Sequence, residues 1–143
     1  MLTKLCSLAL VMIMAASVPA AEQSSVPKTF SAYIGGFNGP TYLVELRDGA
    51  LVYTSGEHRQ QEHKVITPTS AQWREFRQTL DELVVWQWRP DYTNASSADG
   101  TQWRLSLDYP DRGLRSQGSN DFPKHFDRYL AAVRKLLDGE EFR

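Results

Sequence analysis

One stretch decides the fold expected for this chain: TPTSAQWREFRQTLDELVVWQW, which runs from Thr67 to Trp88. Its apolar residues recur three and four positions apart, the spacing that places side chains on one face of an α-helix. A helix that is apolar along one side has to cover that side, so the stretch predicts a helix packed on a sheet. The residues of the apolar face are Trp73, Phe76, Leu80, Leu83 and Val84.

This helix has two candidate starts and one predicted end. Thr67 precedes a proline, which suits an N-cap followed by proline at the first helical position. Thr69 and Gln72 suit a capping box, in which each side chain binds the backbone of the other residue. Apolar and polar residues then alternate over 84–88, which predicts a short strand that ends before Pro90.

A strand and a β-hairpin are predicted ahead of the helix. Apolar and polar residues alternate over 30–34, and a glycine-rich turn follows. Asp48 and Gly49 then separate two alternating runs, and this dipeptide favours a type I′ turn. A two-residue loop fixes the register, so we expect Leu46 to lie opposite Leu51 on the buried side.

A second hairpin is predicted after residue 100. Apolar residues alternate with polar ones from 103 to 109, and the sequence at 110–113 favours a four-residue turn. Counting back from that turn pairs Tyr109 with Leu114. The same count pairs Asp108 with Arg115, which would be an ion pair across two strands.

A second amphipathic helix closes the chain. Pro123 suits its first turn, with Asn120 or Asp121 as the N-cap. We therefore expect an α+β fold: an antiparallel sheet built from two ββα-like halves, with two amphipathic helices packed on one face. The apolar face of the second helix is formed by Phe126, Tyr129, Leu130, Val133, Leu136 and Leu137.

The first residues have the pattern of an export signal. Lys4 precedes an apolar run at 5–16, and small residues before Ala20 suit cleavage after that residue. The run is shorter than the roughly 20 apolar residues that span a bilayer as a helix, so no stable membrane anchor is expected after cleavage. We expect a periplasmic or secreted protein. Its predicted organisation is a signal peptide at 1–20, a flexible lead-in at 21–28 and a single α+β domain at 29–143.

Charge and motif patterns argue against several classes of function. The formal net charge is −1 and no block of Lys and Arg occurs, so a nucleic-acid partner is not expected. His58 and His63 lie five positions apart, a spacing that puts them on opposite faces of a strand. Ser119, Asp121 and His125 lack the glycine pattern of a nucleophile elbow. We therefore predict no catalytic residue, metal site or cofactor.

We expect function in the long polar connection after the first helix, at 89–100. It begins beside an aromatic pair, and loops carry binding residues more often than regular elements do. We expect a non-enzymatic binding or accessory module for a protein or glycan partner, although core packing also accounts for Trp88. The alternative is a small periplasmic hydrolase whose site is assembled only in the fold. The expected contact residues are Trp88, Asp91, Tyr92, Asn94 and Asp99.

Several short motifs resemble one group of proteins. They are the runs 30–37, 73–76 and 99–103, and the run 118–120 followed by Pro123. Together they resemble small exported bacterial proteins grouped as a domain of unknown function. The resemblance covers nearly the whole predicted mature chain, and it implies a setting in the bacterial envelope but no particular activity.

Overall fold

One mixed β-sheet and two helices make up the α+β fold seen in the computed structural model, which describes residues 25–57, 59–96 and 100–143. The described residues contribute seven strands to the sheet. In chain order the elements are β1 (Thr29–Gly35), β2 (Thr41–Arg47), β3 (Ala50–Glu57), β4 (Gln60–Ile66), α2 (Ser70–Glu82), the 3-10 helix η1 (Val85–Gln87), β5 (Asp91–Thr93), β6 (Gln102–Asp108), β7 (Gly113–Ser119) and α3 (Phe126–Leu136).

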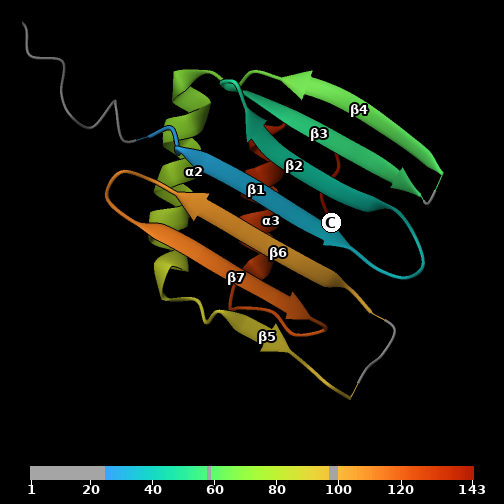
Figure 1. The fold of residues 1–143 in the computed structure, drawn as a ribbon. Helices are drawn as coiled ribbons and strands as arrows, with labels where there is room; N and C mark the ends of the chain where they lie inside the picture. Colours follow the sequence, from blue (N-terminus) through green and yellow to red (C-terminus); the bar gives the residue numbers. More distant parts are fainter. Residues whose placement is uncertain (1–24, 58, 97–99) are drawn as a thin grey trace, which may run out of the picture.

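The strand order is β4-β3-β2-β1-β6-β7-β5. Five of the neighbouring pairs are antiparallel, but β5 runs parallel to β7, and Figure 1 shows it at the end of the sheet. The prediction of an antiparallel sheet was therefore wrong in this respect. The cause is β5 itself, a short polar edge strand held by backbone pairing, which leaves no apolar alternation in the sequence.

The first hairpin has the predicted register. Leu46 pairs with Leu51 across β2 and β3. Asp48 and Gly49 have φ values of 50° and 80°, the positive angles that a type I′ turn requires at both central residues. The prediction is confirmed because the turn type and the apolar alternation specify the same pairing.

The second hairpin differs from the prediction. Asp108 pairs with Gly113, and Arg115 lies opposite Ser106, so the expected pairing of Asp108 with Arg115 was wrong. Tyr109 belongs to the loop, because its amide donates a hydrogen bond to the Arg112 carbonyl (2.8 Å). The turn thus begins one residue earlier than the sequence at 110–113 suggests.

Helix α2 begins where one of the two candidate caps lies. The Thr69 side chain accepts from the Gln72 amide (3.1 Å), and the Gln72 side chain accepts from the Thr69 amide (2.8 Å). The strand expected at 84–88 was wrong, because this segment holds η1 instead. Val84 takes a left-handed conformation (φ 52°) and is 43% exposed, while the next residue, Val85, is fully buried. A left-handed residue between α2 and η1 interrupts the extended backbone that a pleated strand needs, so alternation there does not indicate a strand.

Helix α3 carries the predicted apolar face but starts later than expected. Its N-cap is His125, which has a φ of 60° and makes no capping hydrogen bond through its side chain. Asn120 and Asp121 were therefore wrongly predicted as caps. The residues after Pro123 form a separate turn, closed by the Phe126 amide donating to the Pro123 carbonyl (3.2 Å), before the helix begins.

Aromatic side chains join the sheet to both helices. On β1, Phe30 meets Trp73 and Phe76 of α2, with ring centroids 6.3 and 5.4 Å apart. On β6, Trp103 meets Phe126 of α3 at 4.8 Å. The two helices also contact each other. Burial of each such side chain stabilises the fold by about 1.5–3 kcal/mol, so this cluster is a principal source of stability.

The described chain begins ahead of β1, and the expected signal peptide lies outside the described residues. The Lys28 amide donates to the Asp108 carbonyl (2.7 Å), which extends the pairing of β1 and β6 into the expected lead-in. Within the described ranges, neither helix has both the length and the apolar character needed to span a bilayer.

Candidate binding site on the sheet

The most prominent residue of the predicted contact site, Trp88, lies in the aromatic core. It is 9% exposed, and its ring lies 6.0 Å from Trp103, 6.0 Å from Phe126 and 5.5 Å from Tyr129. The angles between the rings include two edge-to-face contacts, an arrangement that aromatic rings favour when they pack. Packing, the alternative raised from the sequence, therefore accounts for Trp88.

Tyr92 lies beside this core and anchors the start of the polar connection. Its ring is half-buried and lies 5.8 Å from the Trp103 ring. Its hydroxyl accepts a hydrogen bond from the Arg89 amide (3.1 Å), and the Arg89 guanidinium lies over the ring at 4.3 Å. These contacts hold β5 against the end of the sheet.

The other predicted contact residues shape the turn after β5. Asp91 accepts a hydrogen bond from the Thr93 hydroxyl. The Asn94 side-chain oxygen accepts from the Ser96 amide (3.2 Å) and hydroxyl (2.6 Å), which is the pattern of an Asx turn. Asp99 lies outside the described residues. Asp91 and Asn94 are exposed, so they remain at the surface beside β7.

Two of the three histidines considered for a hydrolytic site are described, and both are exposed. His63 lies on β4, where Nδ1 is 3.0 Å from the Thr54 hydroxyl, and it is exposed. His125 is exposed at the start of α3, and His58 lies outside the described residues. Among the residues that the structure describes, no group of three His, Cys, Asp or Glu side chains is placed to hold a metal ion.

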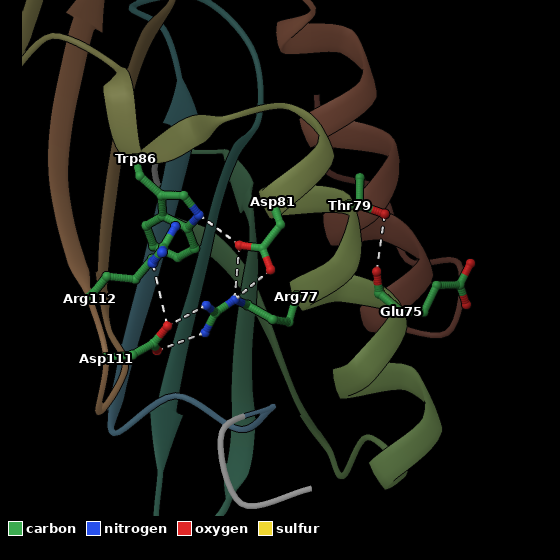
Figure 2. A network of polar contacts seen from close by, with 7 residues as sticks. All are labelled: Glu75, Arg77, Thr79, Asp81, Trp86, Asp111 and Arg112. Atoms are coloured by element: carbon green, nitrogen blue, oxygen red, sulfur yellow. Dashed lines mark hydrogen bonds and ion pairs between the residues drawn. The ribbon is translucent and has the colours of Figure 1, made fainter. Parts of the chain in front are cut away.

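A polar network between α2, η1 and the loop after β6 shows how this protein satisfies a charged group (Figure 2). The Arg77 guanidinium donates two hydrogen bonds to Asp111 (3.0 and 2.7 Å) and two to Asp81 (both 3.1 Å). It also lies over the rings of Trp86 (5.0 Å) and Tyr109 (4.5 Å). The Arg77 side chain is only 13% exposed. The network therefore ties α2 and η1 to the loop between β6 and β7.

The charges in this network are balanced within the protein. The Arg77 guanidinium lowers the pKa of the Asp111 carboxyl to about 2, chiefly by hydrogen bonding to the ionised form. The same hydrogen bonds raise the pKa of Arg77. Burial raises the pKa of Tyr109, which lies against this arginine. Both carboxylates that hold this arginine belong to the protein, so we interpret the network as structural.

A second polar surface lies on the side of β1, β6 and β7 that faces away from the core. Directly opposite residues of antiparallel strands point to the same side, so the pairings give two rows of side chains across β1, β6 and β7. These rows alternate with the buried side chains of the core. We call this surface the polar sheet face. It is formed by Ser31, Ser106 and Arg115 in one row, and by Tyr33, Arg104 and Gln117 in the next.

Two arginines dominate the charge of the polar sheet face. The Arg104 guanidinium lies over the Tyr33 ring at 4.6 Å, which fixes its direction. Arg104 and Arg115 are both exposed. Within the described ranges, no carboxylate lies within ion-pair distance of either one. These two positive charges are therefore not balanced by the part of the chain that the structure describes.

Both arginines line one cleft of about 370 Å³, which we call the arginine cleft. Its walls also include Ser31, Ser106 and Gln117. A smaller cleft of about 150 Å³ lies beside it and shares Arg104 and Gln117. Thr93 of β5 and Tyr33 also line the smaller cleft, which brings the surface close to the predicted contact residues of β5.

Another hollow of about 350 Å³ lies between the loop after β1 and the last residue, Arg143. Phe37, which lines it, is 72% exposed. The Arg143 guanidinium lies 3.5 Å from the Glu141 carboxylate, to which the Tyr42 hydroxyl also donates (2.9 Å). Its positive charge is therefore balanced within the protein, unlike the charges of the arginine cleft.

The polar sheet face was not found from the sequence, although part of its signal is there. Arg104 and Ser106 occupy the polar positions of the strand whose apolar positions predict the core. Their neighbours depend on the strand order and on the register of β7, and that register was wrongly predicted. Placing Tyr33 beside Arg104 needs the pairing of β1 with β6, two strands far apart in sequence. No local pattern specifies that pairing.

The groups on this surface are suited to binding. Guanidinium groups donate hydrogen bonds in a planar fork, while hydroxyl and amide groups can donate and accept. Neither described histidine lines the arginine cleft or the smaller one beside it. These groups can recognise a polar ligand.

Comparisons with known proteins do not extend this description. No model of a known protein family matches the chain. No match is found among curated proteins either. The resemblance to small exported bacterial proteins therefore depends on the sequence motifs alone.

Proposed function

We propose that the protein is an exported, non-enzymatic module of the bacterial envelope, and that it binds a protein or glycan partner through the polar sheet face. One observation carries the proposal: the polar sheet face holds a cleft with two arginines that the described protein leaves unbalanced. Ligand sites commonly have volumes of roughly 300–1,000 Å³ with a few convergent polar groups, and the arginine cleft meets both conditions. Asp91 and Asn94 extend the proposed surface beyond β7.

The architecture that presents this surface is part of the proposal. We infer two ββα-like halves whose helices pack on the same face of the sheet, leaving the polar sheet face uncovered. Phe30 and Leu107 are direct neighbours in the register, as are Ile34 and Trp103, which supports a common core face for β1 and β6. Phe30 touches α2 and Trp103 touches α3, and in Figure 1 both helices are drawn behind the strands.

Export is the second part of the proposal, and it depends on the pattern at 1–20. Expression of the full chain in a bacterial host should give a mature protein in the periplasm or the medium. Its intact mass should correspond to a chain that starts at Ala21. A cytoplasmic protein that keeps residues 1–20 would contradict export.

Blocking the surface tests the binding function. Ser106→Tyr places a bulky ring in the arginine cleft without removing a charge, and Gln61→Tyr places the same ring on the exposed edge strand β4. Each mature variant is immobilised and exposed to a soluble envelope extract, and the retained protein and carbohydrate are quantified. Ser106→Tyr should reduce the specifically retained material by about tenfold, as expected when a central contact is lost. Gln61→Tyr should retain as much as the original protein.

Equal retention by all three proteins would contradict the proposed contact surface. Urea unfolding of the variants is the control for folding. Ser106→Tyr adds its ring on the solvent side of β6, so its unfolding midpoint should stay close to that of Gln61→Tyr.

A further inference from the structure

We propose that the arginine cleft binds the carboxylate groups of an acidic oligosaccharide. The inference rests on the binding function proposed above and names the class of ligand for that surface. It comes from the positions of Arg104 and Arg115, from the charges around them and from the groups that line the cleft.

The register places the two arginines where both can reach one ligand. Ser106 of β6 lies directly opposite Arg115 of β7, and Arg104 is two residues before Ser106 on the same side of β6. Arg104 and Arg115 are therefore diagonal neighbours, a relationship in which Cα atoms lie roughly 7–8 Å apart. Long side chains at that spacing can donate to the same anionic group or to adjacent ones.

The charges around the cleft favour an anion. Two guanidinium groups that face one cleft repel each other, and a bound carboxylate removes that repulsion. Three acidic residues lie on the same side of the sheet: Asp91, opposite Gln117; Asp108, two residues beyond Ser106; and Glu45, opposite Ser31 and paired with Arg47. None of the three lines the cleft, and within the described residues none lies within 4.0 Å of Arg104 or Arg115. The carboxylate has to come from the ligand.

The direction of Arg104 is already fixed before a ligand binds. Its guanidinium lies 4.6 Å from the centre of the Tyr33 ring, as Arg77 lies 4.5 Å from that of Tyr109. At Arg77, two carboxylates of the protein complete the arrangement. At Arg104 the described protein provides no carboxylate in the corresponding position. Fixing an arginine in advance lowers the entropy cost of binding, because fewer rotamers are lost when the ligand arrives.

The groups in the cleft favour a sugar over a protein surface. Protein interfaces have a core of apolar and aromatic anchors. Pro90 forms one apolar wall of the cleft, but the side chains that reach it from the polar sheet face are hydroxyls, an amide and guanidinium groups, which match the hydroxyls and carboxylates of a uronic acid. The smaller cleft continues the surface through Gln117 to Thr93, giving room for more than one sugar unit.

Calorimetric titration with trigalacturonic acid tests this inference. The mature protein is titrated with the acid, with its methyl ester and with a triglutamate peptide of comparable charge. The acid should bind at least about tenfold more tightly than the ester, because the ester lacks the ionised groups that accept charge-assisted hydrogen bonds. It should also bind more tightly than the peptide, because the hydroxyl and amide groups of the cleft match the hydroxyls of a sugar. Affinity should fall as salt rises.

Charge-neutral variants show where the acid binds. Arg104→Gln and Arg115→Gln should each weaken binding of the acid by about tenfold or more. Arg59→Gln, which removes an exposed arginine between β3 and β4, is the matched control and should leave the affinity unchanged. Equal binding of acid and ester, or an equal effect of all three variants, would overturn the inference. Tighter binding of the triglutamate peptide would overturn the sugar class in favour of an acidic protein segment.

The outcome can be separated from a failure of the proposed function. If Ser106→Tyr reduces retention of envelope material but Arg104→Gln and Arg115→Gln do not, the surface binds a partner and the ligand class is wrong. If none of the three changes retention, the surface itself is wrong. If none of the three titrants binds while Ser106→Tyr still reduces retention, the acidic ligand is rejected and the proposed contact surface is kept.

Discussion

Arg77 and Arg104 each lie over a tyrosine ring at nearly the same distance, 4.5 and 4.6 Å, yet their surroundings differ. Arg77 of α2 is held by Asp81 and Asp111. Arg104 lies over Tyr33 on the polar sheet face, where the described protein provides no carboxylate. An arginine that lies over a tyrosine ring is thus paired with carboxylates at Arg77, whereas at Arg104 it has no carboxylate partner in the described protein.

Because of this difference, we expect Arg77 to contribute to stability and Arg104 to contribute to ligand binding. At Arg77, hydrogen bonds and ring contacts connect three segments, so its loss leaves two carboxylates and two aromatic side chains without their partner. At Arg104 the guanidinium is exposed and touches one ring. We expect changes around Arg77 to lower the free energy of unfolding, and changes on the polar sheet face to lower affinity for a ligand.

The largest contrast should come from the aromatic rings of the two sides. Trp88→Ala removes a ring that packs against three others and should cost about 3–5 kcal/mol of unfolding free energy. Tyr33→Ala removes a half-buried ring of the polar sheet face and should cost less than about 1 kcal/mol. Urea unfolding of both variants measures the difference. A small loss for Trp88→Ala would return that residue to the candidate contact surface.

The next effect compares the arginines directly. Arg77→Ala should lower the unfolding free energy by about 2–3 kcal/mol, because Asp111 and Asp81 lose their shared donor and two rings lose a contact. Arg104→Ala should change it by less than about 0.5 kcal/mol. Arg77→Lys should recover little, since an ammonium group cannot form the two parallel hydrogen bonds to Asp111. Similar losses of unfolding free energy for Arg77→Ala and Arg104→Ala would contradict the different roles given to the two arginines.

A pH series sharpens the comparison further. The folded-state pKa of Asp111 is about 2, below its ordinary value of 3.8, because Arg77 binds the ionised carboxylate. A lowered folded pKa adds stability above the unfolded value, and this contribution is lost as pH falls from about 4 through about 2. The urea midpoint of the original protein should therefore fall more over this interval than that of Asp111→Asn. Asp111 is partly exposed, so salt should reduce the difference.

Parallel pH profiles for the two proteins would show that the ion pair adds no measurable stability. Arg104→Gln is the matched control in this series. Because no carboxylate of the described protein pairs with Arg104, that variant should keep the profile of the original protein.

The smallest effect is expected where α2 ends. Val84 has a φ of 52° and is 43% exposed, so its branched side chain costs conformational energy without being fully buried. Val84→Asn should raise the unfolding free energy by about 0.5–1 kcal/mol, because asparagine tolerates the left-handed conformation. Thermal unfolding of the variant measures the gain. A loss of stability would mean that the valine contributes more through packing than the backbone strain costs.

Local sequence signals predicted the parts of the fold that are locally determined. Asp48 and Gly49 specified the first hairpin because a turn type and an apolar alternation agreed. Thr69 and Gln72 offered one of two starts for α2, and the structure selects it. The second hairpin failed because Tyr109, apolar enough to extend the strand, belongs to the loop.

The candidate site depended on long-range order and was not predictable in the same way. The strand β5 is short and polar, and only its pairing with β7 defines it. Arg104 meets Tyr33 across the pairing of β1 with β6, which no turn specifies. For Trp88 the sequence left a contact role and core packing both open, and the structure places it against Trp103, Phe126 and Tyr129.

The central claim is that Arg104, in the arginine cleft, binds a ligand, while Arg77, with its two carboxylate partners, stabilises the fold. Amide chemical shifts of the mature protein, followed by NMR during titration with trigalacturonic acid, test it most directly. The account predicts saturable shifts at Arg104, Ser106, Arg115 and Gln117, with the amides of Arg77 and Asp111 unchanged. Shifts confined to other regions, or none at saturating ligand, would contradict it.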